Sequence, residues 1–157
     1  MKYEKLFSLL DERKETMIED RRWLHMHPEL SFQETETAKY IYEKYKDEDG
    51  VKVEKNIGGN GVKVTIDTKK PGKTIAIRAD FDALPIEEDT GLPYASKNKG
   101  VMHACGHDAH TAYMLNLADA LIEMKDELCG KIVIIHQPGE EMPPGGALAM
   151  IEDGVLD

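Results

Sequence analysis

Nine consecutive residues, 102–110, contain three histidines, one cysteine and one aspartate in the order MHACGHDAH. Within this stretch Cys105 and His107 are two residues apart, and a thiolate and an imidazole nitrogen are both good ligands for zinc-like metals. The pair therefore predicts a metal site directly before a helix. Taken alone, a polar loop with a small buried cysteine explains the same stretch equally well.

A second group of reactive side chains is QPGEE, residues 137–141, which directly follows the apolar stretch KIVIIH. Two adjacent carboxylates at the end of a strand can divide the work of metal-assisted hydrolysis. One binds the metal, and the other takes a proton from water as a general base. The alternative is a solvated acidic turn, as is common for a Glu-Glu pair in an acidic protein.

A third group, RADFDALP at residues 78–85, also follows an apolar stretch, TIAIR. Asp80 and Asp82 are predicted to orient a metal-ligating histidine from behind. The alternative is an ordinary junction between a strand and a loop, with Asp as a turn former. All three groups lie where a predicted strand ends or a predicted helix begins, which favours one shared site.

The elements that position these groups are predicted from the spacing of apolar residues. Helices are predicted over residues 3–26, 35–46, 111–122 and 146–153. Strands are predicted near residues 51–54, 62–66, 74–78 and 131–136, with 74–78 buried and 131–136 central. Residues 86–101 show no period and are expected to form a loop. Strands that alternate with helices place the chain in the α/β class.

The composition narrows the classes of partner. The chain has 157 residues, 41% of them hydrophobic, and its 30 acidic and 20 basic side chains give a formal net charge of -10. No binding to nucleic acid or to anionic membranes is expected, because both need clustered Lys and Arg. No stretch has the apolar length of a signal peptide or a membrane span. Two cysteines are too few for a disulfide framework, so we expect a cytoplasmic protein.

Four sequence blocks together resemble the N-terminal part of the M20-type metal-dependent amidohydrolases, a family that includes N-acyl-amino-acid, hippurate and auxin-conjugate hydrolases. The blocks are LHMHPELSFQETETA, IRADFDALPI, MHACGHDAHTAYML, and HQPGEE followed by GGALAMIEDGVLD. They occur in the order of the family and span residues 21–157. The sequence departs from the family's pattern in two places: at Gly139, where alanine is commoner, and at residues 142–144, where the family tends to be rich in glycine.

The resemblance implies a site for two divalent metal ions, of zinc, manganese, cobalt or nickel. Cys105, His107 and Glu141 match metal ligands, with Cys105 at the bridging position. Glu140 matches the general base, and Asp80 matches the carboxylate that supports the ligands. The implied reaction is hydrolysis of the amide bond of an N-acyl amino acid or related conjugate by a metal-activated water, with Glu140 passing a proton to the leaving amine.

The remaining histidines are less defined by the sequence. His103 is expected to lie beside the metal site because it shares the loop of Cys105. His25 is interpreted as the polar end of a helix, and spacing alone does not place His27.

The implied fold is the zinc-peptidase-like catalytic domain, with a mixed central sheet flanked by helices. Family members continue well past the equivalent of Asp157, so residues 1–157 are expected to be an incomplete N-terminal portion, without the lid or dimerisation domain. An incomplete sheet exposes strand edges, so self-association or binding of a complementary C-terminal fragment is expected. The alternative is a catalytically inactive remnant that serves only as a metal-binding or interaction module.

Overall fold

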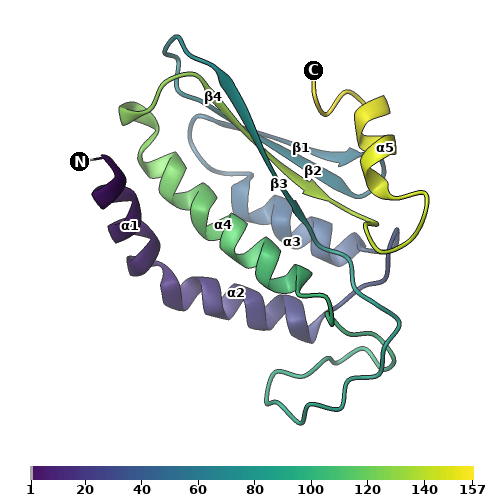
Figure 1. The fold of residues 1–157 in the computed structure, drawn as a ribbon. Helices are drawn as coiled ribbons and strands as arrows, with labels where there is room; N and C mark the ends of the chain where they lie inside the picture. The colour runs from purple at the N-terminus through teal and green to yellow at the C-terminus, as the bar shows by residue number, and fades with distance from the viewer. Residues whose placement is uncertain (1) are drawn as a thin grey trace.

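A computed structural model describes residues 2–157 as one mixed sheet with helices on both faces (Figure 1). The elements, in chain order, are α1 (Lys2–Glu12), α2 (Lys14–Met26), α3 (Thr35–Tyr45), β1 (Val51–Ile57), β2 (Gly61–Asp67), β3 (Thr74–Asp80), α4 (His107–Glu123), a 3-10 turn (Lys125–Glu127), β4 (Lys131–Gln137) and α5 (Gly146–Glu152). The predicted α/β class and the mixed sheet flanked by helices are confirmed.

The sheet has the strand order β1-β2-β4-β3. β2 pairs antiparallel with both β1 and β4, whereas β3 pairs parallel with β4. The register places Asp80 opposite Gln137, so the carboxyl ends of these two parallel strands lie next to each other. The loops that leave β3 and β4 therefore begin side by side, which brings the second and third groups of polar residues together.

Each face of the sheet has its own apolar core. Alternate residues of β2, from Val62 to Ile66, pack with Ile134 against α3 and α4. The opposite face of β4 packs against Met150 of α5 and the following Val155. Helix α2 lies along the outer side of α4 (Figure 1), so α4 is covered on both sides. Its first turn is consequently held between the sheet and α2.

The prediction of one helix over residues 3–26 is wrong, because the helix breaks at Arg13, whose φ and ψ are -96° and 5°. The break lets α1 follow the far end of α4, where Leu9 packs with Ala120 and Met124. The Arg13 guanidinium donates to the carbonyl of Leu9 at 3.2 Å and so satisfies a carbonyl at the end of α1. The helical spacing of apolar residues continues across such a break, so the spacing does not show where the helix ends. The position of the break depends on which element each part of the helix packs against.

The prediction that TIAIR is buried is wrong, because Ile77 is half-buried and the other four residues of this stretch are exposed. β3 lies at the edge of the sheet, and Ile75 is 59% exposed.

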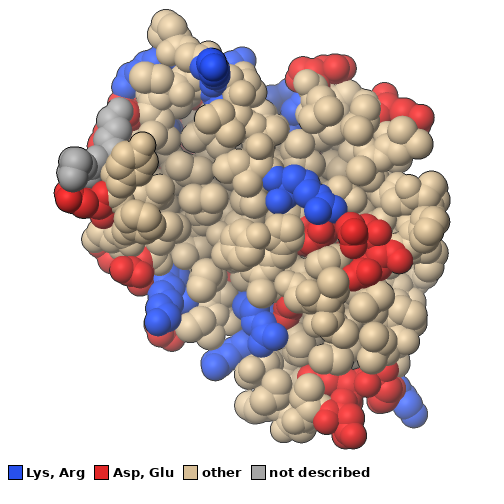
Figure 2. Space-filling view, viewed as in Figure 1, with Lys and Arg blue, Asp and Glu red and all other residues tan. Residues whose placement is uncertain are grey.

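Acidic and basic side chains are interspersed on the face shown in Figure 2. Within residues 2–157, the helices are all too short or too polar to span a bilayer.

Candidate metal centre

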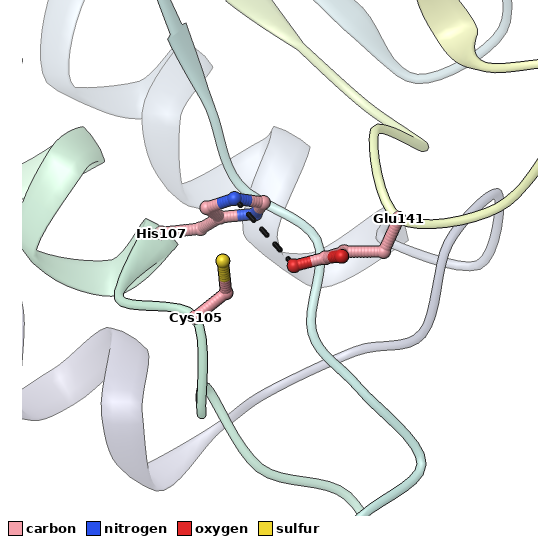
Figure 3. A group of neighbouring side chains, drawn as sticks. All are labelled: Cys105, His107 and Glu141. Carbon is pink, nitrogen blue, oxygen red and sulfur yellow. Dashed lines mark ion pairs between the residues drawn. The ribbon is translucent and has the colours of Figure 1, made fainter.

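Three side chains from two loops and one helix end converge beyond the carboxyl ends of β3 and β4 (Figure 3). Cys105 comes from the loop before α4, His107 is the first residue of α4, and Glu141 follows β4. One ligand atom from each lies within 4.8 Å of the others. Gly106, between the first two, has a φ of 97°, a left-handed conformation that glycine adopts without steric cost.

The imidazole of His107 has a fixed direction. Its Nδ1 donates to the backbone carbonyl of Asp82 at 3.0 Å and lies 3.2 Å from the Asp82 Oδ1. Its Nε2 is left facing three other carboxylates, Asp80 at 3.4 Å, Glu141 at 3.7 Å and Glu140 at 3.8 Å. Metal-ligating histidines are held in this way, with one nitrogen bonded to a carboxylate or carbonyl and the other turned to the metal.

Asp82 organises the site from behind. Its Oδ2 accepts hydrogen bonds from the Ser31 hydroxyl at 2.7 Å and from the Glu141 backbone N–H at 2.9 Å. Burial alone would raise the pKa of Asp82, but the hydrogen bonds from His107, Glu141 and Ser31 hold it well below its usual range. Asp82 thus stays ionised and joins three separate segments, including two that carry candidate ligands.

Asp80 lies on the other side of His107. Its Oδ1 is 2.5 Å from the Nδ1 of His110, and its Oδ2 is 2.8 Å from an Arg78 nitrogen. With His107 and Glu140 it forms a second group of converging ligand atoms that shares His107 with the first. The expected place of Asp80 beside the ligands agrees with this geometry. Its role as a support remains a prediction.

The charges of the site fit a bound cation. Four carboxylates surround one imidazole, and the buried Oε1 of Glu141 has no hydrogen-bond partner among the described residues. Burial alone would lower the pKa of His107, but Asp82 and Asp80 raise it. Contact with Glu141 is the main cause that raises the pKa of the exposed Cys105 thiol. A divalent metal would balance these negative charges, and the sulfur, nitrogen and oxygen donors suit zinc or a similar metal.

The loop that carries Glu140 and Glu141 is held by its backbone. The Gly139 N–H donates to the fully buried Glu34 carboxylate at 2.8 Å, and the Asn60 amide donates to the other oxygen at 3.0 Å. Gly139 has a φ of 62°, and a Cβ placed on it would lie 2.5 Å from the Phe32 ring. The ring thus occupies the space of the alanine side chain that is commoner at this position.

The other histidines have distinct surroundings. His103 is 4% exposed, and neither of its ring nitrogens has a hydrogen-bond partner within the described part of the chain. Burial is the main cause that lowers the pKa of His103 to about 4, so the ring is neutral at pH 7. The Nδ1 of His27 donates to the Trp23 carbonyl of α2 at 2.7 Å. His25 lies in the last turn of α2, in agreement with its interpretation as a helix end, and it is buried between two carboxylates.

Comparison with known proteins agrees with this geometry. Residues 76–157 match the model of peptidase family M20/M25/M40. A Geobacillus stearothermophilus relative named N-acyl-L-amino acid amidohydrolase is 44% identical over 157 residues, which are 100% of this chain and 42% of the relative.

Two solved structures share the fold. A protein of methicillin-resistant Staphylococcus aureus is 69% identical, with a TM-score of 0.95 over 98% of this chain and 39% of its own. The YXEP protein of Bacillus subtilis, described as a dinuclear metal-binding peptidase from the M20 family, is 47% identical. Its TM-score is 0.84 over 90% of this chain and 39% of its own.

The chain therefore belongs to peptidase family M20/M25/M40, a family of hydrolases, as the four sequence blocks predict. It spans 42% of the length of the Geobacillus relative and 39% of each of the two solved structures.

Proposed function

We propose that residues 1–157 form part of the catalytic domain of a metal-dependent amidohydrolase that cleaves the amide bond of N-acyl amino acids. The observation that carries this proposal is the convergence of Cys105, His107 and Glu141, with Glu140 beside them. The name of the Geobacillus relative supports the substrate class, and the dinuclear metal binding described for the YXEP protein supports a site for two metals.

Each side chain has a role that follows from its place. Cys105, His107 and Glu141 hold the metals, which supply Lewis-acid polarisation of the amide carbonyl and activation of water when bound. Glu140 is the general base. Its side chain is 43% exposed, so it can take a proton from water at the open side of the site and deliver it to the leaving amine. Asp82 holds the Nδ1 of His107 and so keeps its Nε2 directed at the metals, and Asp80 supports the site from beside that nitrogen.

Further polypeptide is needed to complete the site. With Glu140 assigned as the base and Asp80 and Asp82 as supports, Cys105, His107 and Glu141 are fewer than the three protein ligands per metal that are usual in catalytic sites. The β3 edge, with Ile75 exposed, offers unpaired backbone groups to another strand. We propose that a complementary C-terminal segment or a second copy pairs there. Sedimentation of the purified chain at several concentrations tests self-association, and a monomer throughout would leave only the complementary segment.

Calorimetric titration with Zn²⁺ and Mn²⁺ tests the metal site. We expect binding that is lost in Cys105→Ser and kept in Glu140→Gln. Cys129→Ser is the matched control, because Cys129 is also an exposed free cysteine but lies between α4 and β4. Equal binding by the wild type and Cys105→Ser would contradict the assignment.

Hydrolysis of N-acetyl and N-benzoyl amino acids by the metal-loaded chain, assayed together with the proposed complementary segment, tests the reaction. Loss of a general base typically costs about 10² to 10⁴ in rate, so Glu140→Gln should lower turnover by that factor. Metal binding that depends on Cys105, with no turnover even when the complementary segment is present, would instead favour the alternative of a non-catalytic metal-binding module.

A further inference from the structure

His25, near the end of α2, is buried between carboxylates from two other parts of the chain. Its Nδ1 lies 2.6 Å from the Asp108 Oδ2, and its Nε2 lies 3.2 Å from the Glu88 Oε1. The three side chains are 3% exposed or less. Carboxylates only accept hydrogen bonds, so both ring nitrogens must donate, and the ring is an imidazolium.

The charges around His25 are balanced inside this cluster. The Arg21 Nε lies 2.8 Å from the same Asp108 oxygen that His25 contacts. Two cations therefore face two carboxylates, which is the condition under which buried charges are tolerated. Burial alone would raise the pKa of Glu88, but hydrogen bonds from Thr90, Ser96 and His25 lower it, so Glu88 remains ionised.

The cluster fastens the loop 86–101, which contains no helix or strand and reaches out beyond the end of α2 (Figure 1). The backbone N–H of Ser96 donates to the Glu88 Oε2 at 2.6 Å. Close by, the Lys97 N–H donates to the carbonyl of Met26, at the end of α2, at 2.9 Å. These polar contacts replace the apolar core that the loop lacks.

The cluster also adjoins the candidate metal ligands. Asp108 directly follows His107, and its Oδ1 accepts the Ala109 N–H at 2.8 Å within the first turn of α4. The loop that Glu88 fastens runs directly into the segment that carries Cys105. His25 therefore holds the chain on both sides of the two ligands, although it touches neither.

We propose that His25 is a positioning residue of the metal centre. Its imidazolium locks the loop 86–101 onto the first turn of α4 and thereby fixes the ring of His107 and the segment of Cys105. The relevance to catalysis rests on the proposed function, but the positioning itself is a property of the chain without metal. In His25→Gln, Glu88 and Asp108 lose their shared cation, so the loop and the helix start should separate.

The test compares the 157-residue wild type with His25→Gln by NMR, without metal. The matched control is His27→Gln, which changes a histidine two residues away whose Nδ1 donates to the Trp23 carbonyl of α2. In the wild type at neutral pH, we expect hydrogens on both ring nitrogens of His25. In His25→Gln, we expect the amides of Ser96 and Lys97 to exchange at least about tenfold faster and the ring signals of His107 to shift. His27→Gln should do neither.

A purely structural role would lower the melting temperature of His25→Gln but leave the His107 ring signals and the loop exchange unchanged, and that result would overturn the proposal. Glu88→Gln is the second variant if His25→Gln does not fold, because it keeps the Asp108 contacts; it should speed the same loop amides and shift the same His107 signals.

Zinc titration of the same proteins separates this proposal from the proposed function. We expect Zn²⁺ affinity to fall by about tenfold in His25→Gln, the lower end of the range for residues that orient a ligand. A wild type that binds no zinc, but in which the His107 ring shifts on His25→Gln, would contradict the metal site and leave the positioning role supported. Unchanged His107 signals would overturn the positioning role whether or not zinc binds.

Discussion

His107 and His25 are both buried histidines that face carboxylates, yet their surroundings differ. The Nε2 of His107 lies 3.4 to 3.8 Å from three carboxylates, beside an exposed cysteine and a buried Glu141 oxygen that has no hydrogen-bond partner among residues 2–157. Both nitrogens of His25 lie within 3.2 Å of a carboxylate oxygen in a closed cluster that Arg21 completes.

The difference shows how one set of residue types serves two purposes. Around His25 the positive charge is the proton of the ring and the guanidinium of Arg21, so the cluster is complete and can fasten two segments. Around His107 the negative charge of the carboxylates exceeds the positive charge that the ring can carry. The candidate ligand atoms converge within 4.8 Å of one another, as the ligands of a metal ion do. The second arrangement is suited to binding a metal, and the first to holding the chain in place.

Among variants that leave the candidate ligands and Glu140 unchanged, the largest effect is expected from Asp82→Asn. It removes the carboxylate that directs His107 and accepts the Glu141 N–H, so metal affinity should fall by about 10- to 100-fold in calorimetry. Asp67→Asn is the control, because Asp67 pairs with Lys131 at the opposite end of the sheet. Equal metal affinity in Asp82→Asn and the wild type would show that metal binding does not depend on the orientation of the His107 ring by Asp82.

Much of the fold follows from local pattern. Alternation and apolar runs predicted the strands, and helical spacing predicted α3, α4 and α5, because both report which face of an element is buried. The convergence of Cys105, His107 and Glu141 follows from motifs at the ends of such elements. Their roles as ligands remain a prediction.

The role of His25 could not be predicted in the same way. Its partner Asp108 lies 83 residues away, and Glu88 lies 63 residues away in a loop without a period. A histidine at a helix end has the same local sequence whether it meets water or two carboxylates. The break at Arg13 and the exposed edge of β3 escaped prediction for a related reason, since both depend on which element packs alongside.

Asp119, a half-buried carboxyl group on α4, extends the comparison between balanced and unbalanced charges. Burial is the main cause that raises the pKa of Asp119 to about 6, and Arg13 offsets only part of this shift. The folded state therefore keeps its proton at higher pH than the unfolded state. Stability contributed by the protonated form is lost as pH rises from about 4 to about 6.

Asp119→Asn should consequently raise the free energy of unfolding by on the order of 2 kcal/mol at pH 7.5 and change it little at pH 4. Urea unfolding at both pH values measures this. Asp126→Asn, at an exposed position, is the control and should change neither value. A uniform gain at both pH values would mean that charge is not the cause.

A smaller effect on stability is expected from Gly139→Ala, next to the loop residues Glu140 and Glu141 of the metal centre. In Gly139→Ala the new Cβ meets the Phe32 ring in a left-handed backbone, so we expect a loss of about 1 kcal/mol and displacement of the exposed ring. Metal affinity should change by less than about threefold. Gly139→Ala in a Phe32→Ala background isolates the backbone strain from the contact. A gain in stability in the single variant would contradict the assigned contact.

The most direct measurement is an NMR titration of the wild-type chain with Zn²⁺ that follows both imidazoles at once. We predict that zinc shifts the ring signals of His107 and displaces any hydrogen on its Nε2, while both ring nitrogens of His25 stay protonated. Zinc that perturbs both rings equally, or that binds without affecting His107, would contradict the distinction between a metal-binding histidine and a positioning one.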